Sequence, residues 1–333
     1  MKILKLKAQL AFSLTLLVGL AMLRLVSPTQ VQAGEVLGIH ILHPYEIEDA
    51  AKLIKTEANS QEWSYVTIPF GTGDIKNLPE WQQFFNRCRE LKIVPIIRLV
   101  TFAREDAWVV PVRADIVKLA KALSFLTWPS DERIILAFNE PNHVHEWGGH
   151  ISPEEYSEIL VFTLDWFQND KVQYTVLPAA MDLAAPNGET TMEAFAYWQR
   201  MLAAQPEIID KIDGWNSHSY PNPGFASAPS RTGKNSLRGY EHELKFLTKY
   251  TKRELPVYIT ETGWVQTPTT SRSLISYYQY AAKNIWSDAR VKAVTPFLLK
   301  GAPGPFEAFS FFDKNGQQTK QFEAYRKVLE SQI

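Results

Sequence analysis

From residue 36 onward, short apolar runs rich in β-branched residues alternate eight times with longer amphipathic stretches. The short runs are almost continuously apolar, which is typical of parallel strands covered on both faces. The longer stretches have the period of helices with one buried face. The predicted strands cover residues 36–42, 65–70, 93–100, 133–139, 174–180, 212–219, 256–261 and 292–299, and the predicted helices cover 46–58, 79–91, 113–126, 153–169, 191–203, 238–252, 271–286 and 317–331.

Eight strand–helix units in succession favour an α/β fold of the (β/α)8 TIM-barrel type, forming a single domain over residues 35–333. A doubly wound open sheet is the alternative. It is disfavoured because Leu42-His43-Pro44 follows the first strand, where that fold carries a Gly-rich phosphate loop. The loop at 221–236 is unusually long and follows the sixth strand, so it predicts a wall of a substrate site.

The first 33 residues have the order of a secretory signal. Three lysines in the first seven residues precede an apolar stretch at 8–23, and the segment ends Val31-Gln32-Ala33. The apolar stretch is shorter than the about 20 residues that span a membrane, so we expect cleavage after Ala33, with an uncleaved anchor as the alternative. In either case the remaining chain is expected outside the cytoplasm: secreted, periplasmic or held at the cell surface by this segment.

The charge and the cysteine content exclude several classes of function. Lys and Arg number 35 against 36 Asp and Glu, without a basic cluster, so we expect no nucleic-acid partner. Cys88 is the only cysteine and continues the apolar pattern of a helix, so it predicts core packing and excludes a Cys-based zinc site. His143 and His145 have metal-ligand spacing, but they lie after the fourth strand, and His40 and His43 are one residue too far apart. We therefore expect no metal and no cofactor.

Two glutamates close otherwise apolar strands. Glu140 follows the fourth predicted strand and Glu261 ends the seventh. An acid in such a place is costly unless it has a partner or a function. The carboxyl ends of barrel strands form the active-site face, so we expect both groups at one mouth. A structural ion pair is the alternative for either glutamate alone.

With these residues the chain resembles the clan A retaining β-glycosidases, which carry an Asn-Glu-Pro acid/base motif after strand four and a nucleophilic Glu after strand seven. Asn139-Glu140-Pro141 resembles the first motif, and Thr260-Glu261-Thr262-Gly263-Trp264 resembles the second. The resemblance covers nearly all of residues 35–333, and the Asn-Glu-Pro-Asn form resembles xylosidase-like and exopolysaccharide-degrading members. It implies double-displacement hydrolysis of a β-linked oligo- or polysaccharide, with Glu140 as acid/base and Glu261 as nucleophile.

The resemblance also implies supporting roles. Arg98, near the end of the third strand, is expected to keep the nucleophile ionised, and Asn139 is expected to bind the sugar 2-hydroxyl. Tyr220 ranks first, and His218 second, as the hydrogen-bond donor to the nucleophile. His40, near the end of the first strand, is expected to reach the sugar.

The eighth strand departs from the pattern. Many relatives place a Trp there as a floor under the reacting sugar, but residues 295–300 contain none. Phe311 or Phe297 is expected to substitute for it. The expected sugar platforms, each with core packing as its alternative, are Trp264, Trp147 and Trp108.

Two other functions remain open. A catalytically silent carbohydrate-binding barrel is expected to lose one glutamate or its supporting cation, and this chain keeps all of them. A transglycosylase would use the same residues and differ only in the exclusion of water. Hydrolysis of an aryl β-glycoside separates an enzyme from a binding protein.

Overall fold

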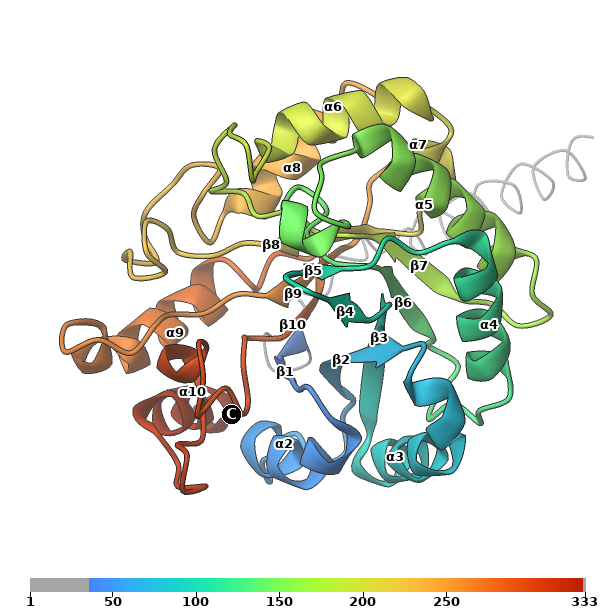
Figure 1. Ribbon diagram of the computed structural model, residues 1–333. Coiled ribbons are helices and arrows are strands. Elements are labelled where there is room, and N and C mark those ends of the chain that lie inside the picture. Colours follow the sequence, from blue (N-terminus) through green and yellow to red (C-terminus); the bar gives the residue numbers. More distant parts are fainter. Residues whose placement is uncertain (1–35, 332–333) are drawn as a thin grey trace, which may run out of the picture. The chain divides into compact units, whose positions relative to one another are not determined.

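The computed structural model describes residues 36–331, and these form a parallel α/β fold (Figure 1). One sheet has five strands in the order β1-β2-β3-β6-β7, and a second has three in the order β10-β9-β8. All pairings within these two sheets are parallel. The eight strands are β1 (Gly38–His40), β2 (Ser64–Gly71), β3 (Ile93–Val100), β6 (Ile134–Ala137), β7 (Thr175–Pro178), β8 (Trp215–His218), β9 (Val257–Glu261) and β10 (Val291–Val294).

The two sheets meet along two seams. A single parallel bridge joins Leu37 to Val294, and another joins Asp182 to His218. The strands therefore follow one another in chain order, as successive βα units require. The predicted parallel α/β fold and its eight strands are confirmed, but the continuous closed ladder of a (β/α)8 barrel is interrupted at both seams.

Helices surround the strands, and each follows its strand as expected (Figure 1). In the fourth of them, α5, Ser152 caps the first turn: its hydroxyl accepts a hydrogen bond from the backbone N–H of Glu155 at 3.3 Å. The main helices are α2 (Ile47–Ile54), α3 (Leu78–Leu91), α4 (Arg113–Ser124), α5 (Pro153–Gln168), α6 (Ala194–Ala204), α8 (Gly239–Leu247), α9 (Leu274–Asn284) and α10 (Lys320–Glu330). A short helix, α7 (Ile208–Lys211), was not predicted.

Both faces of the strands are buried, which explains their continuous apolar sequence. A small cluster made only of strand residues fills the space that the strands enclose, and a larger core lies between strands and helices. Cys88 on α3 is fully buried in that larger core, as predicted. The members of the small cluster are Val94, Ile96, Ile134, Leu136, Leu177, Tyr258 and Ala293.

The loop after β3 contains an antiparallel hairpin that the apolar pattern did not predict. Its strands are β4 (Ala103–Arg104) and β5 (Ala107–Trp108). The predicted export segment, 1–33, lies outside the described residues. None of the helices within residues 36–331 is long and apolar enough to cross a membrane.

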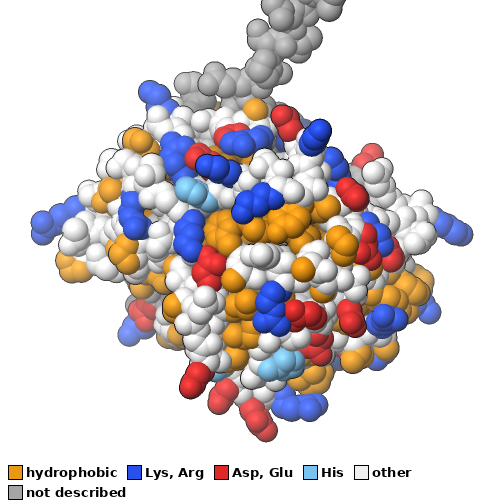
Figure 2. Space-filling view, turned by 90° about the horizontal axis from the view of Figure 1, so that it is seen from above, with side chains coloured by type: hydrophobic (Ala, Val, Ile, Leu, Met, Phe, Trp, Pro, Cys, Tyr) orange, Lys and Arg blue, Asp and Glu red, His pale blue; other side chains and the backbone are white. Residues whose placement is uncertain are grey.

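The face above α6 and α8 carries charges of both signs around apolar side chains (Figure 2). Between these helices the rings of Phe195 and Phe246 pack edge to face at 5.5 Å. This face therefore has no extended area of a single charge.

Candidate active site

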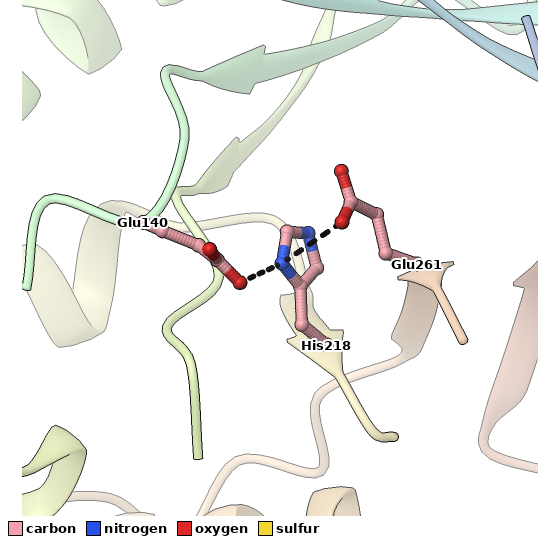
Figure 3. A group of neighbouring side chains, drawn as sticks. All are labelled: Glu140, His218 and Glu261. Carbon is pink, nitrogen blue, oxygen red and sulfur yellow. Dashed lines mark hydrogen bonds and ion pairs between the residues drawn. The ribbon is translucent and has the colours of Figure 1, made fainter. Parts of the chain in front are cut away.

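The structure brings Glu140 and Glu261 together at the carboxyl ends of the strands. Glu261 is the last residue of β9, and Glu140 follows the end of β6. A carboxyl oxygen of each, and a ring nitrogen of His218, lie within 4.8 Å of one another. The three side chains converge from β6, β8 and β9 (Figure 3).

The backbone around Glu140 is strained. Phe138 and Glu140 have φ angles of +75° and +28°, in the left-handed region that side chains disfavour. Such residues cost on the order of 1–3 kcal/mol each and concentrate at functional sites. The turn carries the chain from buried β6 to a carboxyl that faces β8.

Glu261 is buried but surrounded by donors. Its Oε1 accepts a hydrogen bond from Nη1 of Arg98 at 2.5 Å, and its Oε2 accepts one from the Tyr220 hydroxyl at 3.1 Å. Burial acts to raise the pKa of this carboxyl, but the positive charges of His218 and Arg98 outweigh burial and lower the pKa to about 2. Glu261 is therefore ionised at neutral pH.

Besides Glu261, Arg98 contacts two further side chains, those of Asn139 and His40. Its Nη1 also donates to Oδ1 of Asn139 at 2.7 Å, and its Nη2 lies 3.1 Å from Nε2 of His40. Burial, and then the charge of Arg98, lower the pKa of His40 to about 3, so this neutral ring accepts the hydrogen bond. Arg98 thus lies beside Glu261, where a cation was expected, whereas His40 is 0% exposed and contacts Arg98, so the expectation that His40 reaches the sugar is wrong.

His218 lies between the two carboxyls. Its Nδ1 is 2.7 Å from Oε1 of Glu140 and 3.7 Å from Oε2 of Glu261. Burial acts to lower the pKa of His218, but the negative charge of Glu261 and the hydrogen bond to Glu140 raise it above its usual value. Tyr220 is the hydrogen-bond donor to Glu261, and the hydrogen bond of His218 goes to Glu140.

Glu146 was missed in the sequence analysis. It ends the short 3-10 helix η4 (Val144–Glu146) in the loop after β6 and is half-buried. Burial, and then the negative charge of Glu140, raise its pKa to about 7, while a hydrogen bond with Asn139 opposes the rise. The one available signal was its position six residues after Glu140 in an active-site loop.

Two of the expected sugar platforms and one expected substitute for the floor Trp are wrong, and core packing, the alternative given for the two Trp residues, is what the structure shows. Trp264, Trp147 and Phe311 are 0%, 1% and 0% exposed, and a ring without a free face cannot stack on a sugar. Their surroundings explain the burial. The indole N–H of Trp147 donates to Glu155 at 2.9 Å, that of Trp264 donates to the backbone oxygen of Ser227 at 2.8 Å, and Phe311 packs against Tyr325. Trp108 is half-buried, so its contact with a sugar stays a prediction.

Phe297, the other expected substitute for a floor Trp, lies beside the catalytic cluster. Its ring packs edge to face on His40 at 5.3 Å. The long loop after β8 contributes Phe225, whose ring packs 4.9 Å from that of Tyr220. Together with Phe309 these rings form an apolar wall next to Glu261.

Glu140, His218 and Glu261 are close enough to share a cation, and they are the group within residues 36–331 that has this geometry. Each already binds a partner in the protein: Glu261 binds Arg98 and Tyr220, and His218 binds Glu140. Hydrogen bonds within the protein therefore account for the close approach of these three side chains. The expected absence of a metal stays a prediction.

The chain is similar to known proteins in sequence and in fold. A family model described as the glycosyl hydrolase catalytic core matches residues 108–325. Comparison with curated protein sequences finds no match.

Similar folds occur among solved structures. They include an endo-beta-1,4-glucanase from Xanthomonas axonopodis pv. citri (TM-score 0.60, 12% identity, 89% of this chain and 99% of that chain). They also include a GH5_18 protein from Bifidobacterium longum subsp. infantis (0.57, 12%, 89% and 79%) and a beta-glycosidase from Pyrococcus horikoshii (0.53, 12%, 90% and 94%). At these identities the likeness concerns the fold.

The family match covers more than half of the chain and includes both glutamates of the cluster. The chain therefore belongs to the glycosyl hydrolase catalytic core family and is a glycosidase, an enzyme that hydrolyses O-glycosyl bonds.

Proposed function

We propose that this enzyme is a clan A retaining β-glycosidase on a (β/α)8 barrel, and that it cleaves a β-linked oligo- or polysaccharide outside the cytoplasm. The observation that carries the proposal is the pair of neighbouring carboxyls in unlike surroundings, Glu261 held ionised and Glu140 bonded to His218. Retaining chemistry needs one group that attacks and another that gives and takes a proton.

In the first step, the Glu261 carboxylate attacks the anomeric carbon while the bond to the leaving oxygen breaks. Glu140 gives its proton to that oxygen, so the leaving group departs neutral. In the second step, Glu140 takes a proton from water, the water oxygen bonds to the anomeric carbon, and Glu261 is released as a carboxylate. Two inversions at one carbon retain its configuration.

The spacing supports retention. Retaining pairs lie about 5–5.5 Å apart, whereas inverting pairs lie about 6.5–9.5 Å apart to leave room for a water molecule. One carboxyl oxygen of Glu140 and one of Glu261 lie within 4.8 Å of each other, which supports the shorter spacing of a retaining pair.

The substrate class also has support from similar folds. A structurally similar protein, XacCel5A, was solved with cellopentaose, and a GH5_18 protein from Bifidobacterium longum was solved with Manb1-4GlcNAc. We propose β-linked hexose or pentose chains as the first substrates to test, in keeping with the resemblance to xylosidase-like and exopolysaccharide-degrading enzymes.

The test of this function is hydrolysis of a panel of aryl β-glycosides and β-linked polysaccharides, followed by proton NMR. The β-anomer of the new reducing end is expected to appear first and then to equilibrate. An α-anomer that appears first would contradict retention. Binding without hydrolysis of any β-linked substrate would favour the silent carbohydrate-binding alternative, and products longer than the substrate would favour transglycosylation.

A pH profile tests the role of Arg98. The Arg98→Met variant is expected to raise the pKa of Glu261 by about 1–3 units, because an adjacent cation lowers a carboxyl pKa by that amount. Glu261 acts as the ionised form, so the acidic limb of kcat/KM moves to higher pH. Arg98→Lys keeps the charge and is expected to leave that limb nearer its original position.

The matched control is Arg87→Met, which removes an arginine paired with Glu48 on the surface. This change is expected to leave the pH profile unaltered. The thermal unfolding of the three variants shows whether a change in the pH profile comes from a loss of folded protein or from the loss of the positive charge. An unmoved acidic limb in folded Arg98→Met would contradict the assignment.

A further inference from the structure

A buried asparagine joins the turn that carries Glu140 to the loop between β7 and α6. Asn142 lies two residues after Glu140 and is 0% exposed. Its Nδ2 donates hydrogen bonds to the backbone oxygens of Asp182 at 3.1 Å and Met192 at 3.0 Å, and its Oδ1 accepts one from the backbone N–H of Asp182 at 3.2 Å. The side-chain amide therefore uses both of its hydrogens and its oxygen on the main chain of that loop.

The same loop also contacts the strand that carries His218. Asp182 forms a parallel bridge with His218, and Nδ1 of His218 lies 2.7 Å from Oε1 of Glu140. These contacts close a ring, which runs from Glu140 along the chain to Asn142 and across to Asp182. From there the ring returns through His218 to the Glu140 carboxyl, and Figure 3 shows this last contact. A closed ring restricts the movement of the carboxyl relative to His218.

The turn needs such support because its backbone is strained. Phe138 and Glu140 have φ angles of +75° and +28°. Residues in this region persist only where the surrounding contacts over-determine their conformation. Met192 adds a contact of this kind, since its N–H donates to the backbone oxygen of Asn142 at 2.9 Å. The side chain and the main chain of Asn142 are thus both bonded to the loop after β7, at the end of the strained turn.

We propose that Asn142 is a positioning residue for Glu140: it holds the strained turn against the loop after β7, so that the carboxyl stays where proton transfer requires it. The inference rests on the proposed function, in which Glu140 is the acid/base. Asn142 is fully buried, so it acts through the main chain and not on the sugar. Displacement of a reacting group by about 1 Å can cost on the order of 10²-fold in rate, so a side chain that touches no substrate can control the reaction.

His143 provides a second connection between the same two loops. Its Nε2 lies 3.1 Å from Oδ2 of Asp182, and this hydrogen bond raises the pKa of His143 above its usual value. A carboxylate can only accept, so the ring nitrogen donates. The His143 ring is half-buried, which makes it the milder of the two places at which the connection can be cut.

The test compares Asn142→Ala with the wild type on an activated aryl β-glycoside and on an unactivated β-linked oligosaccharide. A displaced Glu140 protonates a poor leaving group less well, so kcat/KM on the oligosaccharide is expected to fall on the order of 10–100-fold. On the activated glycoside the first step survives, and kcat/KM is expected to change less than about threefold. The second step still needs the base, so kcat and KM on this substrate are expected to fall together, and azide is expected to raise kcat again.

Asn59→Ala is the matched control. Asn59 is also buried, and its amide also bonds to the main chain: Nδ2 donates to the backbone oxygen of Ile54 at 2.9 Å, and Oδ1 accepts from the backbone N–H of Thr56 at 2.7 Å. It precedes β2, at the amino ends of the strands, whereas Glu140 lies at the carboxyl ends. Asn59→Ala is therefore expected to lower thermal stability without changing the ratio of the two kcat/KM values.

Two results with folded Asn142→Ala would overturn the inference. Equal losses of kcat/KM on both substrates, with KM unchanged, would mean that Asn142 serves folding alone. No loss on either substrate would mean that Glu140 keeps its position without the amide.

A milder pair of variants keeps the test decisive if Asn142→Ala does not fold. His143→Gln and His143→Phe both remove the charge of the ring, but only glutamine can donate to Asp182. His143→Phe is expected to lower kcat/KM on the oligosaccharide about threefold to tenfold more than His143→Gln does, with equal values on the activated glycoside. Equal effects of the two variants on the oligosaccharide would contradict the inference.

Histidine NMR tests the positioning contact without a substrate. In protein with isotope-labelled histidine, the Nδ1 proton between His218 and Glu140 is expected far downfield, and its loss in Glu140→Ala identifies it. Asn142→Ala is expected to weaken or abolish this signal, and Asn59→Ala is expected to keep it.

The NMR signal and the kinetics together separate this inference from the enzyme function. If Asn142→Ala loses the signal but the wild type hydrolyses no glycoside, the positioning of Glu140 stands and the proposed function fails. If the wild type hydrolyses β-glycosides, and Asn142→Ala keeps both the signal and the ratio of kcat/KM values, the positioning role fails and the proposed function stands.

Discussion

The Glu261→Ala variant is expected to lose turnover on every substrate by a factor on the order of 10⁵–10⁶, as when other enzymes lose their nucleophile. The loss is independent of the leaving group, because without this carboxylate no glycosyl-enzyme forms at all. Initial rates on an activated aryl β-glycoside and on its oligosaccharide counterpart measure it. Glu254→Ala removes an exposed acid just before β9 and is the matched control.

Rescue by azide tests whether Glu261 is the nucleophile, and not only whether it is essential. In Glu261→Ala the space left by the carboxylate lies on the face opposite the leaving group, so azide attacks from there. The expected product from an aryl β-glycoside is an α-glycosyl azide, identified by NMR. A β-azide from this variant would mean that Glu261 is the acid/base and that the two assignments are reversed.

The Glu140→Ala variant is expected to lose about 10²–10⁴-fold on substrates with poor leaving groups and much less on an activated aryl glycoside. An acidic leaving group departs without protonation, so the first step survives. The second step then lacks its general base, and a glycosyl-enzyme is expected to accumulate on Glu261, where mass spectrometry of peptides locates it.

Azide needs no deprotonation, so it is expected to rescue Glu140→Ala and to release a β-glycosyl azide. Glu140→Gln keeps the shape of the side chain and an acceptor for His218, yet it cannot carry the proton. Glu140→Gln is expected to lose as much activity as Glu140→Ala. Such equal losses would show that the missing proton, and not a change in packing, causes the effect. If both variants turned over poor leaving groups at the wild-type rate, Glu140 would have no catalytic role.

The strands and the two glutamates could be predicted because a short-range signal identifies each. A run such as Ile134–Ala137 must be covered on both faces, and an acid such as Glu261 at the end of an apolar run is conspicuous. Parallel strands then bring such ends to one side of the sheet without further information. Arg98 and His40 follow the same logic, because both lie on strands.

The aromatic platforms could not be predicted in the same way. Whether Trp147 shows a face depends on how its loop folds, and here Phe138 and Tyr156 pack on its ring. Trp264 is covered by Tyr277 and Tyr278 from a helix that follows later in the chain. Composition alone does not distinguish such packing from a sugar platform.

Glu146 and the β4–β5 hairpin were missed for a related reason. The hairpin strands have two residues each, too short for an alternating pattern to show. Glu146 belongs to a polar loop in which one more acid is unremarkable. Its environment arises from Glu140 and Asn139, which only the fold brings next to it.

The two seams between the sheets divide the catalytic machinery into halves. Arg98 and Glu140 come from the five-stranded half, whereas His218 and Glu261 come from the three-stranded half. The contacts that hold the carboxyls at working distance, Arg98 to Glu261 and His218 to Glu140, therefore run from one half to the other. Along the seams the strand ladder is reduced to one bridge each, with a few further backbone hydrogen bonds such as His40 N–H to Pro296 and Asp213 N–H to Val176, so these side chains add to the connection between the two halves. The same hydrogen bonds set the reaction geometry and hold the scaffold in the shape that the reaction requires.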